Sequence, residues 1–147
     1  MAAHNLALFF HIAAAIVWMG GMVFMVLALR PALAPLDAPA RLRVVAAALS
    51  RFLTLVAISI ALLLLTGGFM FSDAGSAPLG WNAMAALGVL MMLVFGHIAF
   101  VPYRRLKRAV AGQDWPAGGA AVAQITLLAK INLGLGWIAI AAVLLWR

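Results

Sequence analysis

Apolar residues occur along the chain in four long stretches, and polar or proline-containing segments separate them. A helix that crosses a bilayer needs about 20 largely apolar residues, and each stretch is long enough for one crossing. The pattern predicts an all-α fold, a bundle of four transmembrane helices, in which residues 1–147 form a single integral membrane domain. The four predicted spans are residues 5–29, 52–71, 81–102 and 122–146.

Proline and aspartate mark the ends of the first two predicted helices. The first helix is expected to end at Arg30 and Pro31, because the proline-rich segment that follows cannot continue a helix. Asp37 is predicted to cap a second helix that begins near Pro39 and enters the membrane near Phe52.

The later helix boundaries follow from aromatic residues, glycines and prolines. The third helix is expected to open at Trp81, an aromatic residue typical of the membrane interface, and to end at Val101 before Pro102. The segment AGQDWPAGG, residues 111–119, is predicted to be a turn before the last helix.

Composition supports a membrane protein and excludes several kinds of site. The chain is 68% hydrophobic and 9% charged. It contains no cysteine, which excludes disulfides, iron–sulfur clusters, thiolate metal sites and c-type haem attachment. No lysine or arginine precedes the first apolar stretch, so this stretch is expected to be a retained helix and not a cleaved signal peptide.

The distribution of charge predicts how the chain is oriented. The net charge is +7, and the basic residues gather in the first and third connections, whereas the middle connection carries only Asp73. Because lysine and arginine favour the cytoplasmic side, both termini are predicted to lie on the periplasmic side of a bacterial inner membrane. The basic groups of the third connection are expected to bind anionic lipid headgroups and not nucleic acid; they are Arg104, Arg105, Lys107 and Arg108.

Few side chains in the predicted spans can take part in chemistry. Polar or ionisable groups are costly in a bilayer, so each is a candidate for function. The alternative is a hydrogen bond to a neighbouring helix. The three acids all fall in connections, so the spans hold no carboxylate pair for acid–base catalysis. The candidates among the polar residues are His11, His97, Lys130 and Asn132.

One stripe of the first helix combines histidine with methionine. At about 100° per residue, the stripe is predicted to face the bundle. Imidazole and thioether groups suit Cu(I), although methionine is also a common packing residue. His4 lies about 10 Å from His11 along the helix axis and Met22 about 16 Å from it, so these side chains would be successive stations on a path. The stripe comprises His4, His11, Trp18, Met22, Met25 and Leu29.

The two intramembrane histidines are predicted to lie at different depths. His97 falls near the end of its span and His11 near the start of its own, which separates them by about 14 Å of depth. One haem iron bound by both in a monomer is therefore disfavoured. His11 is predicted to meet Met84 or Met91, with Gly88 leaving room for a flat ligand.

The predicted depths of the residues along the spans also indicate a polar cluster. Lys130, Asn132 and Thr54 fall near the predicted depth of His97. The sequence therefore predicts a possible polar cluster on the inner side of the bundle.

The chain resembles the CopD family, the membrane domain associated with bacterial copper resistance and copper uptake. The residues that carry the resemblance include the motif HxxxxxxWxGG in the first span, Arg51 with Phe52, Gly67, His97 and the NLGLG segment that begins at Asn132. The resemblance implies an inner-membrane protein that handles copper, with His11 and His97 as ligand candidates. Larger relatives have more spans, so a homodimer of this small chain is expected to be attractive.

The chain also resembles HemJ-type protoporphyrinogen oxidases, four-helix membrane proteins that bind b-type haem. The matching residues are His11, Trp18 with Met19, Gly21, Gly80 with Trp81, His97 and Asn132. The chain departs from that family at Val26 and Leu27, where the family has proline and arginine, and at Leu133, where it has an acid. The first span also lacks the family's histidine at its end.

Three functions follow from these patterns. The first is a protein that binds or passes copper, and it predicts that His11 faces one lumen together with Met22 and Met25. The second is a b-type haem protein with His11 as ligand, and the third is a non-catalytic accessory subunit of the membrane. Whether the protein is an enzyme is left open; as an enzyme it would be a haem-dependent membrane oxidoreductase.

Overall fold

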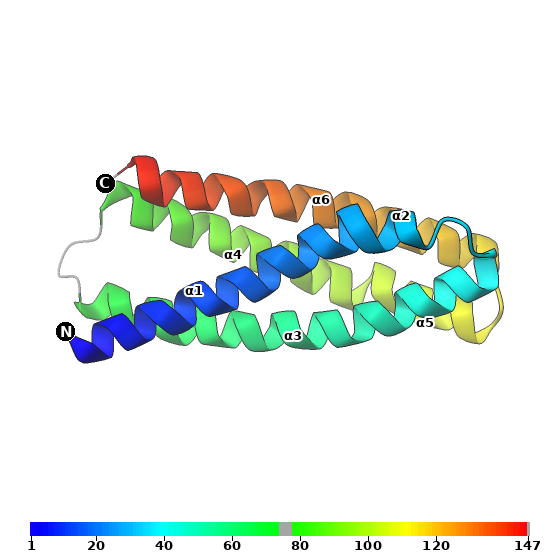
Figure 1. Cartoon of the computed structure of the whole chain (residues 1–147), viewed down its shortest axis with the longest axis horizontal. Coiled ribbons are helices and arrows are strands. Elements are labelled where there is room, and N and C mark those ends of the chain that lie inside the picture. Colours follow the sequence, from blue (N-terminus) through cyan, green and yellow to red (C-terminus); the bar gives the residue numbers. More distant parts are fainter. Residues whose placement is uncertain (74–77, 147) are drawn as a thin grey trace.

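The protein is a bundle of four long helices (Figure 1). The computed structural model describes residues 1–73 and 78–146, and this part of the chain contains no strand. Residues 74–77 of the predicted middle connection lie outside the described residues. The elements are α1 (Ala2–Val23), the π-helix η1 (Phe24–Leu29), α2 (Arg30–Ala32), α3 (Ala38–Asp73), α4 (Leu79–Phe100), α5 (Pro102–Ala111) and α6 (Trp115–Leu145).

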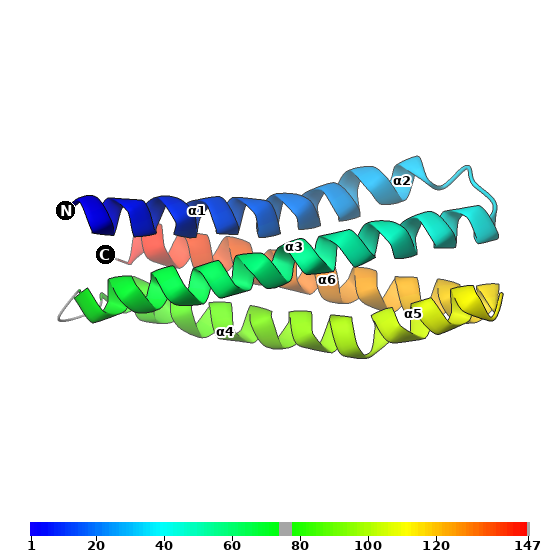
Figure 2. The same cartoon turned by 90° about the horizontal axis from the view of Figure 1, so that it is seen from below.

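Four helical stretches are long and apolar enough to cross a membrane, which confirms the predicted all-α class with four spans. Successive stretches run in opposite directions, so the N- and C-termini lie at the same end of the bundle (Figures 1 and 2). We call this the terminal end, and the opposite one the far end. That the terminal end faces the periplasm stays a prediction. The four stretches are Ala2–Ala32, Ala38–Ser72, Leu79–Ala111 and Trp115–Leu145.

Two of the predicted helix boundaries are confirmed. The carboxylate of Asp37 accepts a hydrogen bond from the backbone N–H of Ala40 at 3.2 Å, as expected of an N-cap. At the end of α4, the helix stops at Phe100 and a new short helix begins at Pro102.

The prediction of a turn throughout residues 111–119 is wrong. Helix α6 begins at Trp115, because Asp114 caps it by accepting a hydrogen bond from the N–H of Ala117 at 3.0 Å. Pro116 falls in the first turn, where a helix tolerates proline. Gly118 lies within the helix, where a Cβ atom would come 2.9 Å from a methyl carbon of Leu42. The glycine therefore lets α6 approach α3 closely.

The π-helix η1 changes which residues face the bundle at the end of the first span. A π-helical turn holds more residues than an α-helical turn, and inward positions recur here at intervals of four. Trp18, Met22 and Val26 are buried, and Arg30, four residues later, is exposed. The predicted stripe continued through Met25 instead, which the structure leaves only partly buried.

Two groups of buried side chains hold the bundle together. The central cluster lies halfway along it and consists of Trp18, Met22, Val56 and Met91. The far cluster consists of Leu42, Val45, Leu49, Ile98, Leu106, Ala121, Val122 and Ile125. Helix α1 packs mainly on α3, whereas α6 packs on α4 and α5. Both clusters lie away from the termini.

The short helix α5 carries the basic residues of the third connection on its exposed side. Leu106 and Ala109 are buried, whereas Arg104, Arg105, Lys107 and Arg108 are exposed. Its buried side packs on α6, and its basic side chains face outward. Binding of anionic headgroups by these four residues stays a prediction.

Candidate metal site

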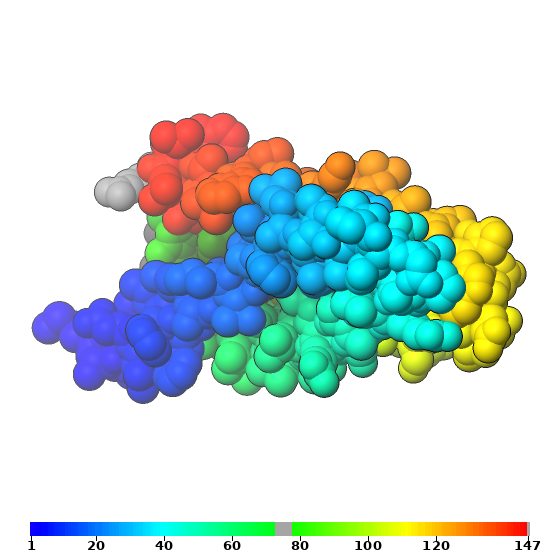
Figure 3. Space-filling model, turned by 45° about the vertical axis from the view of Figure 1, so that its right-hand side comes forward, coloured from blue at the N-terminus to red at the C-terminus, as the bar shows by residue number. Residues whose placement is uncertain are grey.

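A cavity of about 260 Å³ lies in the terminal half of the bundle, between α1, α3, α4 and α6. His11, Met84, Gly88 and Met91 all line it, so the structure brings together the residues that helix geometry had placed at one depth. The space-filling view shows the hollow, where the blue surface of α1 and the red surface of α6 part and green surface lies behind them (Figure 3). The other lining residues are Ala15, Trp18, Met19, Leu63, Leu64, Gly67, Gly68, Phe71, Ala85, Val89, Met92, Gly136, Ala139 and Ile140.

His11 is held by a hydrogen bond to α3. Its Nδ1 atom lies 2.9 Å from the Oγ1 atom of Thr66. The hydroxyl of Thr66 donates its only proton to the carbonyl oxygen of Leu62, at 2.6 Å. In the contact with His11 the hydroxyl oxygen must therefore accept, and Nδ1 must carry the proton. The neutral ring then has its lone pair on Nε2, the nitrogen left for a ligand.

Gly67 gives the imidazole its space. A Cβ atom at this position would stand 3.3 Å from Cε1 of His11, closer than ordinary van der Waals contact. The neighbouring residue Thr66 supplies the hydrogen bond. One turn of α3 thus fixes the ring both by a polar contact and by leaving room for it.

Four methionines line the same cavity as His11: Met19 of α1, and Met84, Met91 and Met92 of α4. Two of them lie against Gly136 of α6. A Cβ atom there would overlap the sulfur of Met19 and come 3.1 Å from the methyl carbon of Met91. The absence of a side chain at Gly136 therefore lets a methionine of α1 and one of α4 reach the same point.

Gly88 has no such packing role. An added Cβ atom would meet nothing within 4 Å, although the residue lines the cavity. The same is true of Gly68 on α3. These two glycines leave open space in a wall that is otherwise built of aliphatic, aromatic and thioether groups.

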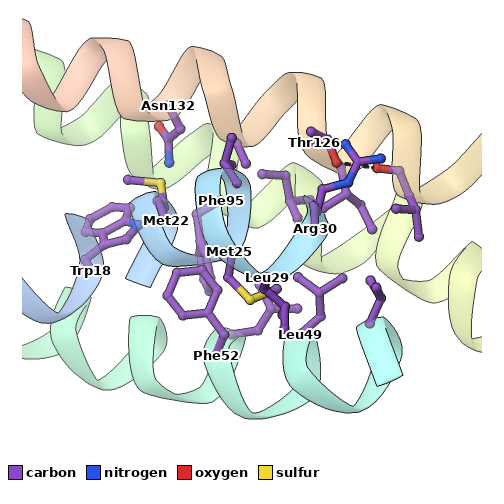
Figure 4. A pocket seen from close by; sticks show the side chains of 17 residues that line it. Trp18, Met22, Met25, Leu29, Arg30, Leu49, Phe52, Phe95, Thr126 and Asn132 are labelled. Carbon is purple, nitrogen blue, oxygen red and sulfur yellow. Dashed lines mark hydrogen bonds between the residues drawn. The ribbon is translucent and has the colours of Figure 1, made fainter. Parts of the chain in front are cut away.

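A second, smaller cavity of about 50 Å³ lies next to the first and farther from the termini. Figure 4 shows Met22 and Met25 of the first span at this cavity, with Asn132 pointing toward Trp18 and Met22. Trp18 lines both cavities. The expectation of one lumen shared by His11, Met22 and Met25 is therefore wrong for the described residues, because the indole of Trp18 stands between two separate spaces.

Asn132 has an unusual environment in the second cavity. The residue is 1% exposed, and its Oδ1 atom has no hydrogen-bond partner within the described part of the chain. An unpaired buried acceptor costs roughly 1–3 kcal/mol.

The predicted polar cluster around His97 does not form. His97, Lys130 and Thr54 are all exposed, whereas Asn132 is buried. The hydroxyl of Thr54 donates to the carbonyl of Ser50, in its own helix. Residues 130 and 132 point in nearly opposite directions because two helical positions differ by about 200°. Equal depth does not bring these groups together, because their angular positions around the helices separate them.

The remaining predicted ligands lie apart from His11. His97 and His4 do not line the 260 Å³ cavity, so His11 is the one histidine there. The described residues contain no group of three or more histidine, cysteine, aspartate or glutamate side chains that could hold a metal. Among the residues that line the cavity, the other side chains that can bind a metal are thioethers.

Comparison with known proteins gave a family match. The model of the family described as Copper resistance protein D matches residues 46–146. The matched region begins within α3 and includes α4, α5 and all of α6, so α1 with His11 lies before it. No curated protein and no solved structure matches the chain significantly.

Proposed function

The chain belongs to the CopD family of copper resistance proteins, and from this premise we propose that it binds Cu(I) in the cavity beside His11. Membership of the family makes the chain a multi-pass protein of the bacterial inner membrane involved in copper handling. The proposal adds a place and a set of ligands. The observation that carries it is the meeting of one histidine and four methionines in one cavity.

The ligands favour a soft, singly charged ion. Nε2 of His11 offers a lone pair, and thioethers select Cu(I) among the biological metal ions. All these ligands are neutral, and no carboxylate among the described residues lines the cavity. Burying a charge in apolar surroundings is costly, and the cost rises steeply with the charge on the ion. A monovalent ion is therefore favoured over a divalent one.

The methionines have distinct parts in this proposal. Met19 and Met91 approach each other at Gly136 and are the first choice as sulfur ligands. Met84 and Met92 line the same space and would exchange with them as the ion enters or leaves. His4, near the terminal end, and Met22 with Met25, beyond Trp18, are proposed as stations before and after this site.

Binding of Cu(I) to purified protein tests the proposal. The protein in detergent is titrated without oxygen against a chromogenic Cu(I) chelator, and the affinity is compared between variants. We expect His11→Ala to lower the affinity at least tenfold, and Met19→Leu with Met91→Leu to lower it as well. His97→Ala is the matched control, since it removes a histidine outside the cavity. Wild-type affinity in His11→Ala would overturn the proposal.

Haem is the second candidate, and the open space at Gly68 and Gly88 favours a flat ligand. Two features count against it. The cavity of about 260 Å³ is smaller than the roughly 300–1,000 Å³ of typical small-molecule sites, and His97 lies outside it. Protein from haem-replete cells should therefore show no Soret band; a band lost in His11→Ala would favour haem and a redox function.

Co-purification with another membrane protein, without bound metal or haem, would favour an accessory subunit.

A further inference from the structure

A third cavity, of about 220 Å³, lies at the far end of the bundle and is separate from the metal site. Two arginines from different segments line it: Arg30, at the start of α2, and Arg41 of α3. The rest of its wall is mostly apolar and comes from the first connection, α3 and α6. These other lining residues are Leu33, Ala34, Leu42, Val45, Gly119 and Val122.

The π-helix is the reason that Arg30 reaches this position. Without it, the inward face of the first span would pass through Met25 and Leu29 at about 100° per residue. With it, Trp18, Met22 and Val26 are buried, and Arg30, the next residue of this series, is exposed but lines the cavity. Figure 4 shows the side chain of Arg30 extending from α2 toward α6, beside Thr126. π-Helical turns occur frequently at functional sites.

The positive charge of the two guanidinium groups is not balanced within the described part of the chain. No carboxylate lines the cavity. Arg41 donates one hydrogen bond, from Nη1 to the carbonyl oxygen of Leu36 at 3.4 Å, which leaves most of its five N–H groups available. On the opposite wall, a Cβ atom at Gly119 would meet nothing within 4 Å. The cavity thus combines available guanidinium N–H donors with open space beside Gly119.

We propose that this cavity binds the phosphate group of an anionic phospholipid. Guanidinium groups bind phosphate oxygens in pairs, and basic pockets between membrane helices bind lipid headgroups. Leu33, Leu42 and Val45 provide an apolar surface beside the two arginines for the lipid's hydrocarbon portion. The cavity lies where the first span ends, at the level at which headgroups are found. Free phosphate would make the same contacts with the two guanidinium groups, but it has no hydrocarbon portion to pack against the apolar wall.

Retention of phosphatidylglycerol in native mass spectrometry tests the proposal. The protein is purified in mild detergent, titrated with phosphatidylglycerol or with neutral phosphatidylcholine, and the fraction with bound lipid is measured. The test variant is Arg30→Gln with Arg41→Gln. The matched control is Arg43→Gln with Arg51→Gln, which removes the same charge from α3 at two exposed positions outside the cavity. All variants are checked for an unchanged elution volume, and Arg30→Lys with Arg41→Lys keeps the charge should the glutamines disturb folding.

The expected result is a loss of at least tenfold in apparent affinity for phosphatidylglycerol in the Arg30/Arg41 glutamine variant, with less than a twofold change in the control. The lysine variant should fall between the two. Inorganic phosphate at millimolar concentration should not displace the lipid; displacement that depends on Arg30 and Arg41 would assign the cavity to free phosphate instead. Equal losses in the test and control variants would overturn the proposal, because the attraction would then be diffuse. None of these outcomes depends on copper binding.

Discussion

The Nδ1 atom of His11 and the Oγ1 atom of Thr66 lie 2.9 Å apart, and the hydroxyl proton of Thr66 is committed to the carbonyl of Leu62. Thr66 therefore fixes which nitrogen of His11 is free, without itself reaching the cavity. We expect Thr66→Val, which removes the acceptor at constant shape, to lower Cu(I) affinity about 10- to 100-fold, the usual effect of losing a partner of a metal-binding histidine.

Thr66→Ser is the control for this prediction, since it keeps the hydroxyl and should keep most of the affinity. The nitrogen resonances of the His11 ring, measured by NMR, give a second readout. In the wild type the proton should reside on Nδ1, and in Thr66→Val both tautomers should be populated. Unchanged affinity and unchanged tautomer in the valine variant would contradict the assigned role.

Filling the cavity should block the metal site. Gly88→Leu places a side chain where an added Cβ atom meets nothing within 4 Å and where the cavity begins. We expect a loss of Cu(I) affinity of at least tenfold with little change in stability. Gly96→Leu is the matched control on the same helix, because Gly96 also has open space around it and does not line the cavity. Equal losses of Cu(I) affinity in the two variants would show that any bulky side chain in α4 weakens binding, and would contradict the role assigned to the cavity.

The neighbouring glycines of the first span should respond in opposite ways to alanine. A Cβ atom at Gly21 would overlap the ring of Phe52, whereas one at Gly20 would meet nothing within 4 Å. Overpacking costs typically about 1–3 kcal/mol, so Gly21→Ala should lower the free energy of unfolding by about this amount. Gly20→Ala should leave it unchanged or raise it. Unfolding by sodium dodecyl sulfate in mixed micelles measures both, and equal stability of the two variants would contradict the close contact of α1 with α3.

Asn132 should be dispensable for stability. Its Oδ1 atom is buried without a partner, and an unpaired acceptor costs roughly 1–3 kcal/mol. Asn132→Leu keeps a similar volume and removes the polar group, so the free energy of unfolding should stay equal or rise. A clear fall would mean that the amide has a partner in the membrane, such as a bound water or ion, and the same unfolding assay distinguishes the two outcomes.

The spans and the depth of each residue were predictable because apolar length and helix rise are properties of the local sequence. Depth alone brought His11, Met84, Gly88 and Met91 to one level, and all four line one cavity. The contribution of Met19 was missed, since it lies outside the stripe that seemed to face the bundle. Only the position of Gly136 on another helix explains how its sulfur reaches the same space.

Angular position was harder to predict, because it depends on which helices pack together and on irregular turns. No residue pattern in the sequence signals the π-helix that precedes Arg30. Thr66 resembles any hydroxyl that bonds to its own helix. His97 and Lys130 share a depth with Asn132 but lie on exposed faces. Tertiary packing determines which way each of these side chains faces, and it cannot be read from a single amino-acid sequence.

Arg30 lines both the small cavity beyond Trp18 and the cavity it shares with Arg41. A copper ion that left His11 for the far end would thus advance toward a fixed positive charge. Two unit charges 4 Å apart repel by about 4 kcal/mol at an effective dielectric constant of 20. The positive charge of Arg30 would thus act as a barrier to the ion at the far end. A lipid phosphate seated on Arg30 would lower that barrier, so the composition of the surrounding membrane would set how readily the ion crosses.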